Sequence, residues 1–94
     1  MSGTDIARAS ALITNKRGLH ARASAKFVET VARFRADVTV TKGAASVSGR
    51  SIMGLMMLAA SQGSSIELAA TGPEAQSAID ALLALVDAKF HEDA

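Results

Sequence analysis

Strand-like and helix-like patterns alternate along all of this 94-residue chain, with no linker or low-complexity segment between them. Small or apolar residues recur at every second position in residues 6–14, which is typical of a half-buried strand. In residues 21–35 they recur every three or four positions without Gly or Pro, which predicts an amphipathic helix. Connections this short favour an α+β two-layer sandwich, in which an antiparallel sheet carries its helices on one face.

The middle of the chain predicts a hairpin and then a short helix. Residues 38–41 are all β-branched, and a Lys42-Gly43 turn separates them from a second short strand at residues 44–48. Ser51 stands where the N-cap of a helix at residues 52–60 is expected.

The last third predicts a fourth strand at residues 65–70 and a long final helix. Thr71 and Glu74 lie three residues apart, which fits a capping box at the start of that helix. Apolar positions continue at helical spacing as far as Phe90. The expected element order is β-α-β-β-α-β-α, with three phenylalanines in the core: Phe27, Phe34 and Phe90.

Length and composition exclude several classes of protein. We expect one domain over residues 1–94, with an ordered core at about residues 6–90. The chain has no Cys and only two His, so a disulfide framework, a metal site and a bound cofactor are not expected. No apolar run approaches the roughly 20 residues that span a bilayer, and no signal peptide is recognised, so we expect a cytoplasmic protein without a membrane partner. Its only aromatic residues are three Phe, which argues against a nucleic-acid partner.

The formal net charge of +1 hides an uneven distribution. Residues 1–50 carry a net charge of +6, and residues 51–94 carry −5. This asymmetry suggests one electropositive face for an anion or an acidic partner. A solvated surface with two halves that attract each other would also explain it.

The segment from Asn15 to Arg22 is the most informative, because it places His20 at the start of the first predicted helix and Arg22 two residues inside it. Helix starts present unpaired backbone N–H groups and partial positive charge, which stabilise anions. A phosphoryl group on the His20 ring would be stabilised by these groups and by the Arg22 guanidinium. From spacing alone, however, a His at this position is more often a helix cap or a solvent-facing residue.

Three separated blocks give the chain a family resemblance. They are Gly18-Leu19-His20-Ala21-Arg22-Ala23-Ser24-Ala25 followed by Phe27-Val28, then Ser51-Ile52-Met53-Gly54-Leu55-Met56, then Ala70-Thr71-Gly72-Pro73. In this order they resemble the HPr family, the phosphocarriers of the bacterial phosphoenolpyruvate-dependent phosphotransferase system (PTS). The resemblance spans about residues 6–90 and implies an open-faced sandwich, with a four-stranded antiparallel sheet in the order 1-4-2-3 and three helices on one face.

The resemblance also implies roles for individual residues. His20 would accept a phosphoryl group on Nδ1 from phosphorylated enzyme I and pass it to a IIA protein or domain. Arg22 would orient and neutralise that group, and the backbone N–H groups of Ala21, Arg22 and Ala23 would hold it. The chain would be a monomeric phosphoryl carrier with a phosphohistidine intermediate rather than an enzyme acting alone, since it contains no Walker-type phosphate loop.

Ser51 has two interpretations. As a helix N-cap it needs no further function. In the resembling family, this Ser is phosphorylated in some bacteria by an HPr kinase/phosphorylase. A phosphate there would add negative charge to the surface that meets enzyme I and weaken transfer to His20.

The helix at residues 52–60 is too apolar for its size. Its buried stripe is either Leu55, Leu58 and Ala59 or Ile52, Leu55, Met56 and Ala59, and the resemblance favours the first. The apolar residues left over would form a docking patch near His20, ringed by basic residues that meet the acidic face of a partner. The docking residues expected are Arg17, Lys26, Arg50, Ile52, Met53, Met56 and Met57.

Two other functions are considered for the chain, and His91 is not expected to take part in either. Family members commonly have Pro where this chain has Ala23, so a nitrogen-type regulatory carrier, not coupled to sugar transport, is the alternative branch. A non-catalytic α+β binding module is a more distant alternative. His91 has no Arg beside it and no helix start, so we expect it to be exposed and inert.

Overall fold

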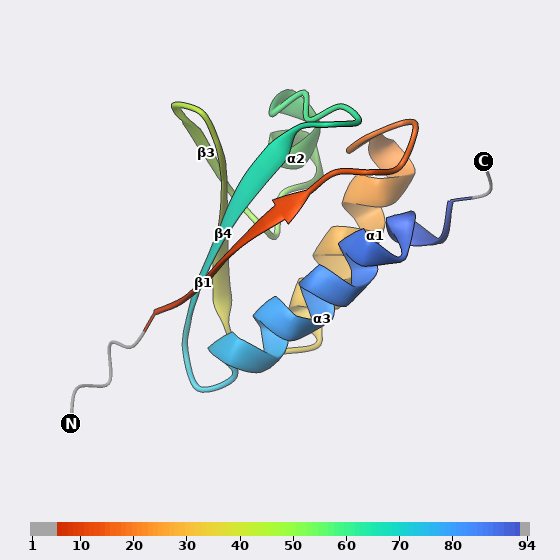
Figure 1. The fold of residues 1–94 in the computed structure, drawn as a ribbon. Coiled ribbons are helices and arrows are strands. Elements are labelled where there is room, and N and C mark those ends of the chain that lie inside the picture. The colour runs from red at the N-terminus through yellow and green to blue at the C-terminus, as the bar shows by residue number, and fades with distance from the viewer. Residues whose placement is uncertain (1–5, 93–94) are drawn as a thin grey trace.

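The computed structural model describes residues 6–92, which form four strands and three α-helices in the predicted order (Figure 1). The strands are β1 (Ala7–Leu12), β2 (Asp37–Lys42), β3 (Ala45–Ser48) and β4 (Ser65–Thr71). The helices are α1 (Ala21–Ala32), α2 (Ile52–Met57) and α3 (Ala75–Asp87), followed by the single 3₁₀ turn η1 (Lys89–His91).

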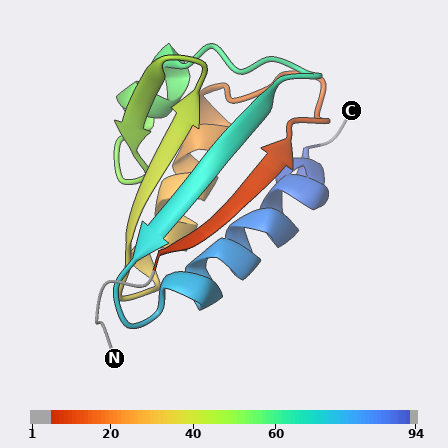
Figure 2. The same cartoon turned by 60° about the vertical axis from the view of Figure 1, so that its left-hand side comes forward.

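All strand pairs are antiparallel, and the sheet order is β1-β4-β2-β3, so the expected open-faced sandwich is confirmed. The helices cover one face of the sheet, and the other face is open (Figure 2). Between residues 6 and 92, no helix combines the length and the apolar character needed to cross a bilayer.

The core lies between the sheet and the helices and follows the sequence periodicities. Val40 on β2 and Leu68 on β4 are register partners, and both side chains are buried on the helix-facing side. Phe27 and Val31, one helical turn apart on α1, are fully buried, as their spacing predicts. Phe34 is only partly buried and packs against the edge of the core.

The start of α3 differs from the predicted capping box. The N-cap of α3 is Glu74, which makes no side-chain cap bond, and Thr71 is the last residue of β4. Glu74 Oε1 accepts from the backbone N–H of Arg35 at 2.7 Å, while the Glu74 N–H donates to the Arg35 carbonyl oxygen at 3.0 Å. The Glu74 side chain therefore ties the start of α3 to the connection between α1 and β2 instead of capping its own helix.

The end of α3 also differs from the prediction that helical spacing extends to Phe90. The helix ends at Asp87, and Lys89, Phe90 and His91 adopt left-handed backbone angles, with φ of 56°, 55° and 57°. This turn folds Phe90 back into the core, where it is 2% exposed. The spacing correctly predicted a buried Phe90, but a left-handed turn after α3, rather than a continuation of the helix, places it in the core.

Candidate functional site

The loop between β1 and α1 shapes the site around His20. Gly18 has φ of +62°, and a Cβ at this position would collide with the carbonyl oxygen of Ala60, so the loop requires Gly here. The next N–H, of Leu19, donates to that same oxygen at 2.9 Å. The loop is thereby joined to the segment after α2, and His20 is placed at the start of α1.

His20 is the N-cap of α1, as the sequence predicts. Its backbone is extended, and its Nδ1 accepts a hydrogen bond from the Arg22 backbone N–H at 3.2 Å. Since Nδ1 is an acceptor, it carries a lone pair and no proton in this arrangement. The first-turn N–H groups of Ala21, Arg22 and Ala23 have no carbonyl partner within the helix; that of Arg22 binds His20 Nδ1, and those of Ala21 and Ala23 remain available to an anion.

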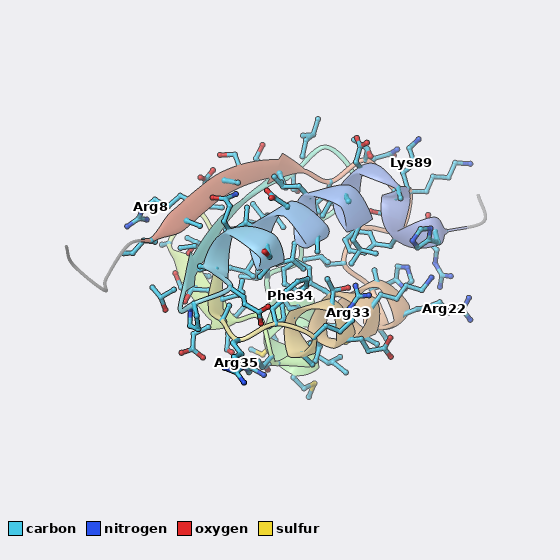
Figure 3. All side chains as sticks on the ribbon, turned by 90° about the horizontal axis from the view of Figure 1, so that it is seen from below. Arg8, Arg22, Arg33, Phe34, Arg35 and Lys89 are labelled. Carbon is cyan, nitrogen blue, oxygen red and sulfur yellow. The ribbon has the colours of Figure 1, made fainter. Side chains whose placement is uncertain are left out.

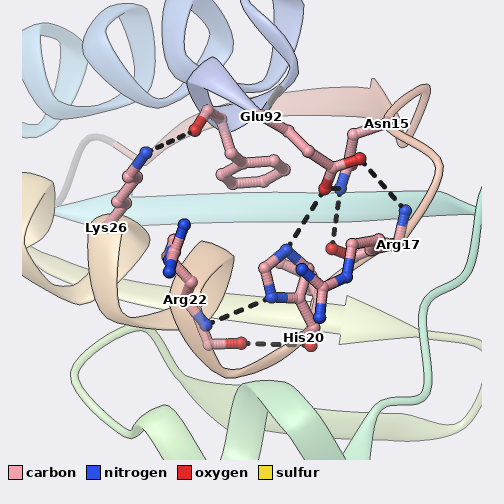
Figure 4. Close-up of polar contacts among 10 residues, drawn as sticks. Asn15, Arg17, His20, Arg22, Lys26 and Glu92 are labelled. Carbon is pink, nitrogen blue, oxygen red and sulfur yellow. Dashed lines mark hydrogen bonds and ion pairs between the residues drawn. The ribbon is translucent and has the colours of Figure 1, made fainter. Parts of the chain in front are cut away.

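The other ring nitrogen of His20 meets a residue that sequence reasoning missed. His20 Nε2 lies 3.2 Å from Glu92 Oε1, and both side chains are largely buried, with 19% of His20 and 9% of Glu92 exposed. The interaction spans 72 residues of sequence, and neither the loop nor the acidic end of the chain carries a signal that pairs them. Figure 4 shows the imidazole held between the Arg22 N–H on one side and the Glu92 carboxylate on the other.

Glu92 is itself held by the loop. Its Oε1 accepts from Asn15 Nδ2 at 2.9 Å, and its Oε2 accepts from the Arg17 backbone N–H at 3.3 Å. The Asn15 hydrogen bond is the main cause of a lowered pKa for the Glu92 carboxyl, and the Arg17 N–H and His20 act in the same direction against the opposing effect of burial. Glu92 is therefore a carboxylate at neutral pH.

A cavity of about 70 Å³ opens beside His20. It is lined by Arg17, His20, Arg22, Ala23, Phe90, His91 and Glu92. His91 is exposed, as expected, but it shares this cavity with both arginines, which its place in the sequence did not indicate. A larger hollow, of about 520 Å³, lies between β1 and α3 and contains no His or Arg, so it offers nothing for phosphoryl chemistry.

The basic residues do not all gather around His20 but are spread along the length of the molecule. Arg22 and Lys89 lie at one end of the molecule and Arg8 at the other, with Arg33 and Arg35 between them (Figure 3). Lys26 does lie near the site, but its ammonium donates to the carbonyl oxygen of Phe90 at 2.8 Å, so that group holds the C-terminal segment.

Arg50 is placed at the wrong end of α1 for a ring around His20. Its guanidinium donates to the carbonyl oxygen of Ala36 at 3.0 Å, beyond the C-terminal end of α1. Since α1 has 12 residues and is about 18 Å long, Arg50 lies roughly a helix length from His20.

Ser51 is the N-cap of α2, and its Oγ accepts from the Gly54 N–H at 2.9 Å. The first of the two alternative stripes of α2 is the buried one, because Leu55 and Leu58 are buried. Ala59 departs from it, since this residue is exposed in a left-handed conformation. The exposed apolar residues on α2 are Ile52 (41%), Met53 (71%), Met56 (40%) and Met57 (81%).

Residues 7–88 match the protein family described as "PTS HPr component phosphorylation site". Phosphocarrier protein HPr from Neisseria meningitidis serogroup A is 51% identical over 80 residues, which cover 85% of this chain and 90% of the relative. Phosphocarrier protein NPr from Shewanella violacea is 45% identical over 80 residues, covering 85% and 88%.

The fold also matches that of a solved structure. The crystal structure of HPr-C-His from Thermoanaerobacter tengcongensis has a TM-score of 0.88 and 41% sequence identity, and the match covers 94% of this chain and 99% of that one. Fold, sequence and the three motif blocks agree, and the chain belongs to the HPr family of phosphocarrier proteins of the phosphotransferase system.

Proposed function

We propose that His20 is the residue that carries the phosphoryl group, accepting it on Nδ1 from phosphorylated enzyme I and passing it to a IIA protein or domain. The observation that carries this proposal is the acceptor state of Nδ1, 3.2 Å from the Arg22 N–H at the start of α1. A ring nitrogen with a free lone pair is a nucleophile, and it stands where the helix start stabilises the anion that it receives.

The phosphoryl group would replace the ring as the partner of the helix start. When Nδ1 attacks phosphorus, its lone pair forms the new bond and no longer accepts from the Arg22 N–H. The Arg22 N–H group would then donate to a phosphoryl oxygen, as would the N–H groups of Ala21 and Ala23. The exposed Arg22 side chain is close enough along the chain to neutralise the added charge.

The docking surface that we propose combines the exposed apolar residues of α2 with the basic residues near His20. α2 leads to Ala60, whose carbonyl oxygen binds Leu19, so its exposed side chains continue the surface on which His20 lies. Met side chains adapt to differently shaped partners, which suits a carrier that meets a donor and several acceptors in turn. Arg17 and Arg22 line the cavity within this surface and suit an acidic partner face.

Ser51 is proposed as a regulatory phosphorylation site for an HPr kinase/phosphorylase. Ser51 is half-buried, and its Oγ accepts a hydrogen bond from the Gly54 N–H. The next two residues, Ile52 and Met53, are exposed. A phosphate at Ser51 would place negative charge beside this apolar patch and weaken binding to an acidic partner.

The pathway branch has two candidates. Relatives named HPr favour sugar-linked phosphotransfer, and the NPr relative supports a nitrogen-type regulatory carrier. Because the chain belongs to a family of phosphocarriers, the alternative of a non-catalytic binding module is no longer considered. We place the chain in the cytoplasm as a monomer, where it would meet enzyme I and IIA partners.

The test is a transfer assay with purified enzyme I, phosphoenolpyruvate and a IIA protein. Wild type should become phosphorylated by enzyme I and lose its phosphate to IIA, whereas His20→Ala should do neither. His91→Ala is the matched control, because His91 lines the same cavity, and it should behave as wild type. Phosphorylation of His20→Ala at the wild-type rate would remove His20 from the proposal.

A further inference from the structure

The hydrogen bond between His20 and Glu92 determines which ring nitrogen carries the proton. Nδ1 accepts from the Arg22 N–H, and Nε2 faces the Glu92 carboxylate, which can only accept. Both contacts are satisfied together only when Nε2 carries the hydrogen and Nδ1 carries the lone pair. Two independent partners, one on each side of the ring, thus favour the same tautomer.

A buried amide aims the carboxylate at the ring. Asn15 is 1% exposed, and its Nδ2 donates to both the Gly18 carbonyl oxygen, at 2.8 Å, and Glu92 Oε1. Because both partners are acceptors, the NH₂ group of the Asn15 amide, and not its oxygen, must face them. Its Oδ1 is buried and has no hydrogen-bond partner among the described residues. A buried unpaired oxygen is unfavourable, and its presence here is explained if the opposite side of the amide is needed to position Glu92.

The C-terminal segment is folded to bring Glu92 to this place. Three consecutive residues with side chains occupy the left-handed region, which each of them disfavours. The burial of Phe90 and the bond from Lys26 to the Phe90 carbonyl oxygen oppose that cost. The left-handed turn ends with the Glu92 carboxylate 3.2 Å from the ring.

We propose that Glu92 is a positioning residue for phosphoryl transfer, which keeps the hydrogen on Nε2 and the lone pair on Nδ1 of His20 and stabilises the positive charge that the ring gains during transfer. This inference rests on the proposed role of His20. It assigns a function to a carboxylate that contacts Nε2 of the ring and not the reacting Nδ1.

The electron balance shows when the carboxylate acts. As Nδ1 attacks, its lone pair forms the Nδ1–P bond, and the bond from phosphorus to the donor breaks, with its electron pair leaving on the donor. Nε2 keeps its hydrogen, so the ring becomes a cation beside the carboxylate. In onward transfer the acceptor bonds to phosphorus, the Nδ1–P bond breaks, and its electron pair returns to Nδ1. The ring leaves as neutral imidazole, and no proton moves in either step.

The test compares Glu92→Ala with Glu29→Ala, since Glu29 is an exposed carboxylate on α1 with no side-chain hydrogen bond among the described residues. In the free protein, ¹⁵N NMR of the His20 ring should show Nε2 as pyrrole-type and Nδ1 as pyridine-type in wild type and Glu29→Ala. Glu92→Ala should show a mixture of the two tautomers. Transfer from enzyme I to Glu92→Ala should slow about tenfold, the size expected for losing one charge-assisted hydrogen bond.

Glu92→Gln removes the negative charge of the side chain but keeps its shape. Amide NMR spectra report whether each variant keeps the wild-type fold. Glu92→Gln should also slow transfer, because its amide does not stabilise the ring cation. An unchanged tautomer in Glu92→Ala would overturn the inference, even if transfer slowed. So would wild-type transfer rates in both variants. Failure of wild type to be phosphorylated at His20 would instead overturn the proposed function, and the tautomer measurement, made without any partner, keeps the two failures distinct.

Discussion

The ammonium of Lys26 lies 2.8 Å from the carbonyl oxygen of Phe90, which ties the second turn of α1 to the turn that follows α3. Through this bond the helix that begins at His20 also fixes the segment that delivers Glu92 to His20. The site is therefore built from both ends of the chain, and its integrity depends on a contact outside the reacting groups.

Lys26→Met should loosen the C-terminal segment while keeping the apolar part of the side chain in place. We expect the free energy of unfolding to fall by about 1 kcal/mol, the net value of one such hydrogen bond. Hydrogen exchange at His91 and Glu92 should accelerate more than exchange in the sheet. Equal acceleration throughout would show that Lys26 supports the fold as a whole and not this segment. Lys16→Met, at an exposed loop position, is the control.

Gly18 and Gly43 form a matched pair for testing how tightly the loop before His20 is packed. Both have positive φ, +62° and +59°, but a Cβ at Gly18 would meet the Ala60 carbonyl oxygen, whereas a Cβ at Gly43 would meet nothing within 4 Å. Gly43→Ala should cost about 1 kcal/mol of stability from backbone strain alone. Gly18→Ala should cost more, and its transfer rate should fall because His20 shifts. Equal losses in chemical denaturation would contradict the close packing.

The pKa of Glu92 predicts how stability depends on pH. Its folded value lies below the ordinary 4.5, so the carboxylate stabilises the fold fully above the unfolded pKa, and this contribution is lost as pH falls through the folded pKa. His20 is the titratable group in contact with it, and Arg17, Arg22 and His91 line the same cavity. Wild type should lose more stability than Glu92→Gln as the pH falls from about 5 through the folded pKa of Glu92. Parallel stability curves for the two proteins would contradict this.

The exposed methionines of α2 should contribute to binding and not to folding. Met53→Gln with Met57→Gln should weaken the affinity for enzyme I about tenfold, through loss of apolar contact, and change stability by no more than about 0.5 kcal/mol. Leu12→Gln is the control, since Leu12 is also exposed but lies on β1, outside the docking surface. An affinity loss as large for Leu12→Gln would place the docking surface elsewhere. Isothermal titration calorimetry measures the affinities, and chemical denaturation measures the stabilities.

Local periodicity was sufficient to predict the elements of the fold. The alternation in residues 65–70 and the helical spacing around Phe27 reflect which side chains face the core, and those faces are what the structure buries. The His20 N-cap could be predicted for the same reason, because a cap is a local arrangement of a side chain and the next turn of backbone.

Interactions between distant parts of the chain could not be predicted in this way. Thr71 and Glu74 have the spacing of a capping box, but the Glu74 carboxylate accepts from the Arg35 N–H instead, which only the folded chain brings near. Lys89, Phe90 and His91 give little indication of left-handed backbone, since Gly is absent and of the three only His is enriched at positive φ. The contact between His20 and Glu92 depends on that turn, so it too was beyond prediction from sequence.

Whether Nδ1 of His20 carries the phosphoryl group is tested most directly by locating that group with NMR after incubation with enzyme I and phosphoenolpyruvate. We expect a single ³¹P phosphoramidate signal, with ¹⁵N coupling that assigns it to Nδ1 of His20, present in His91→Ala and absent in His20→Ala. A phosphoramidate signal that persists in His20→Ala, or one assigned to Nε2 of His20, would contradict it.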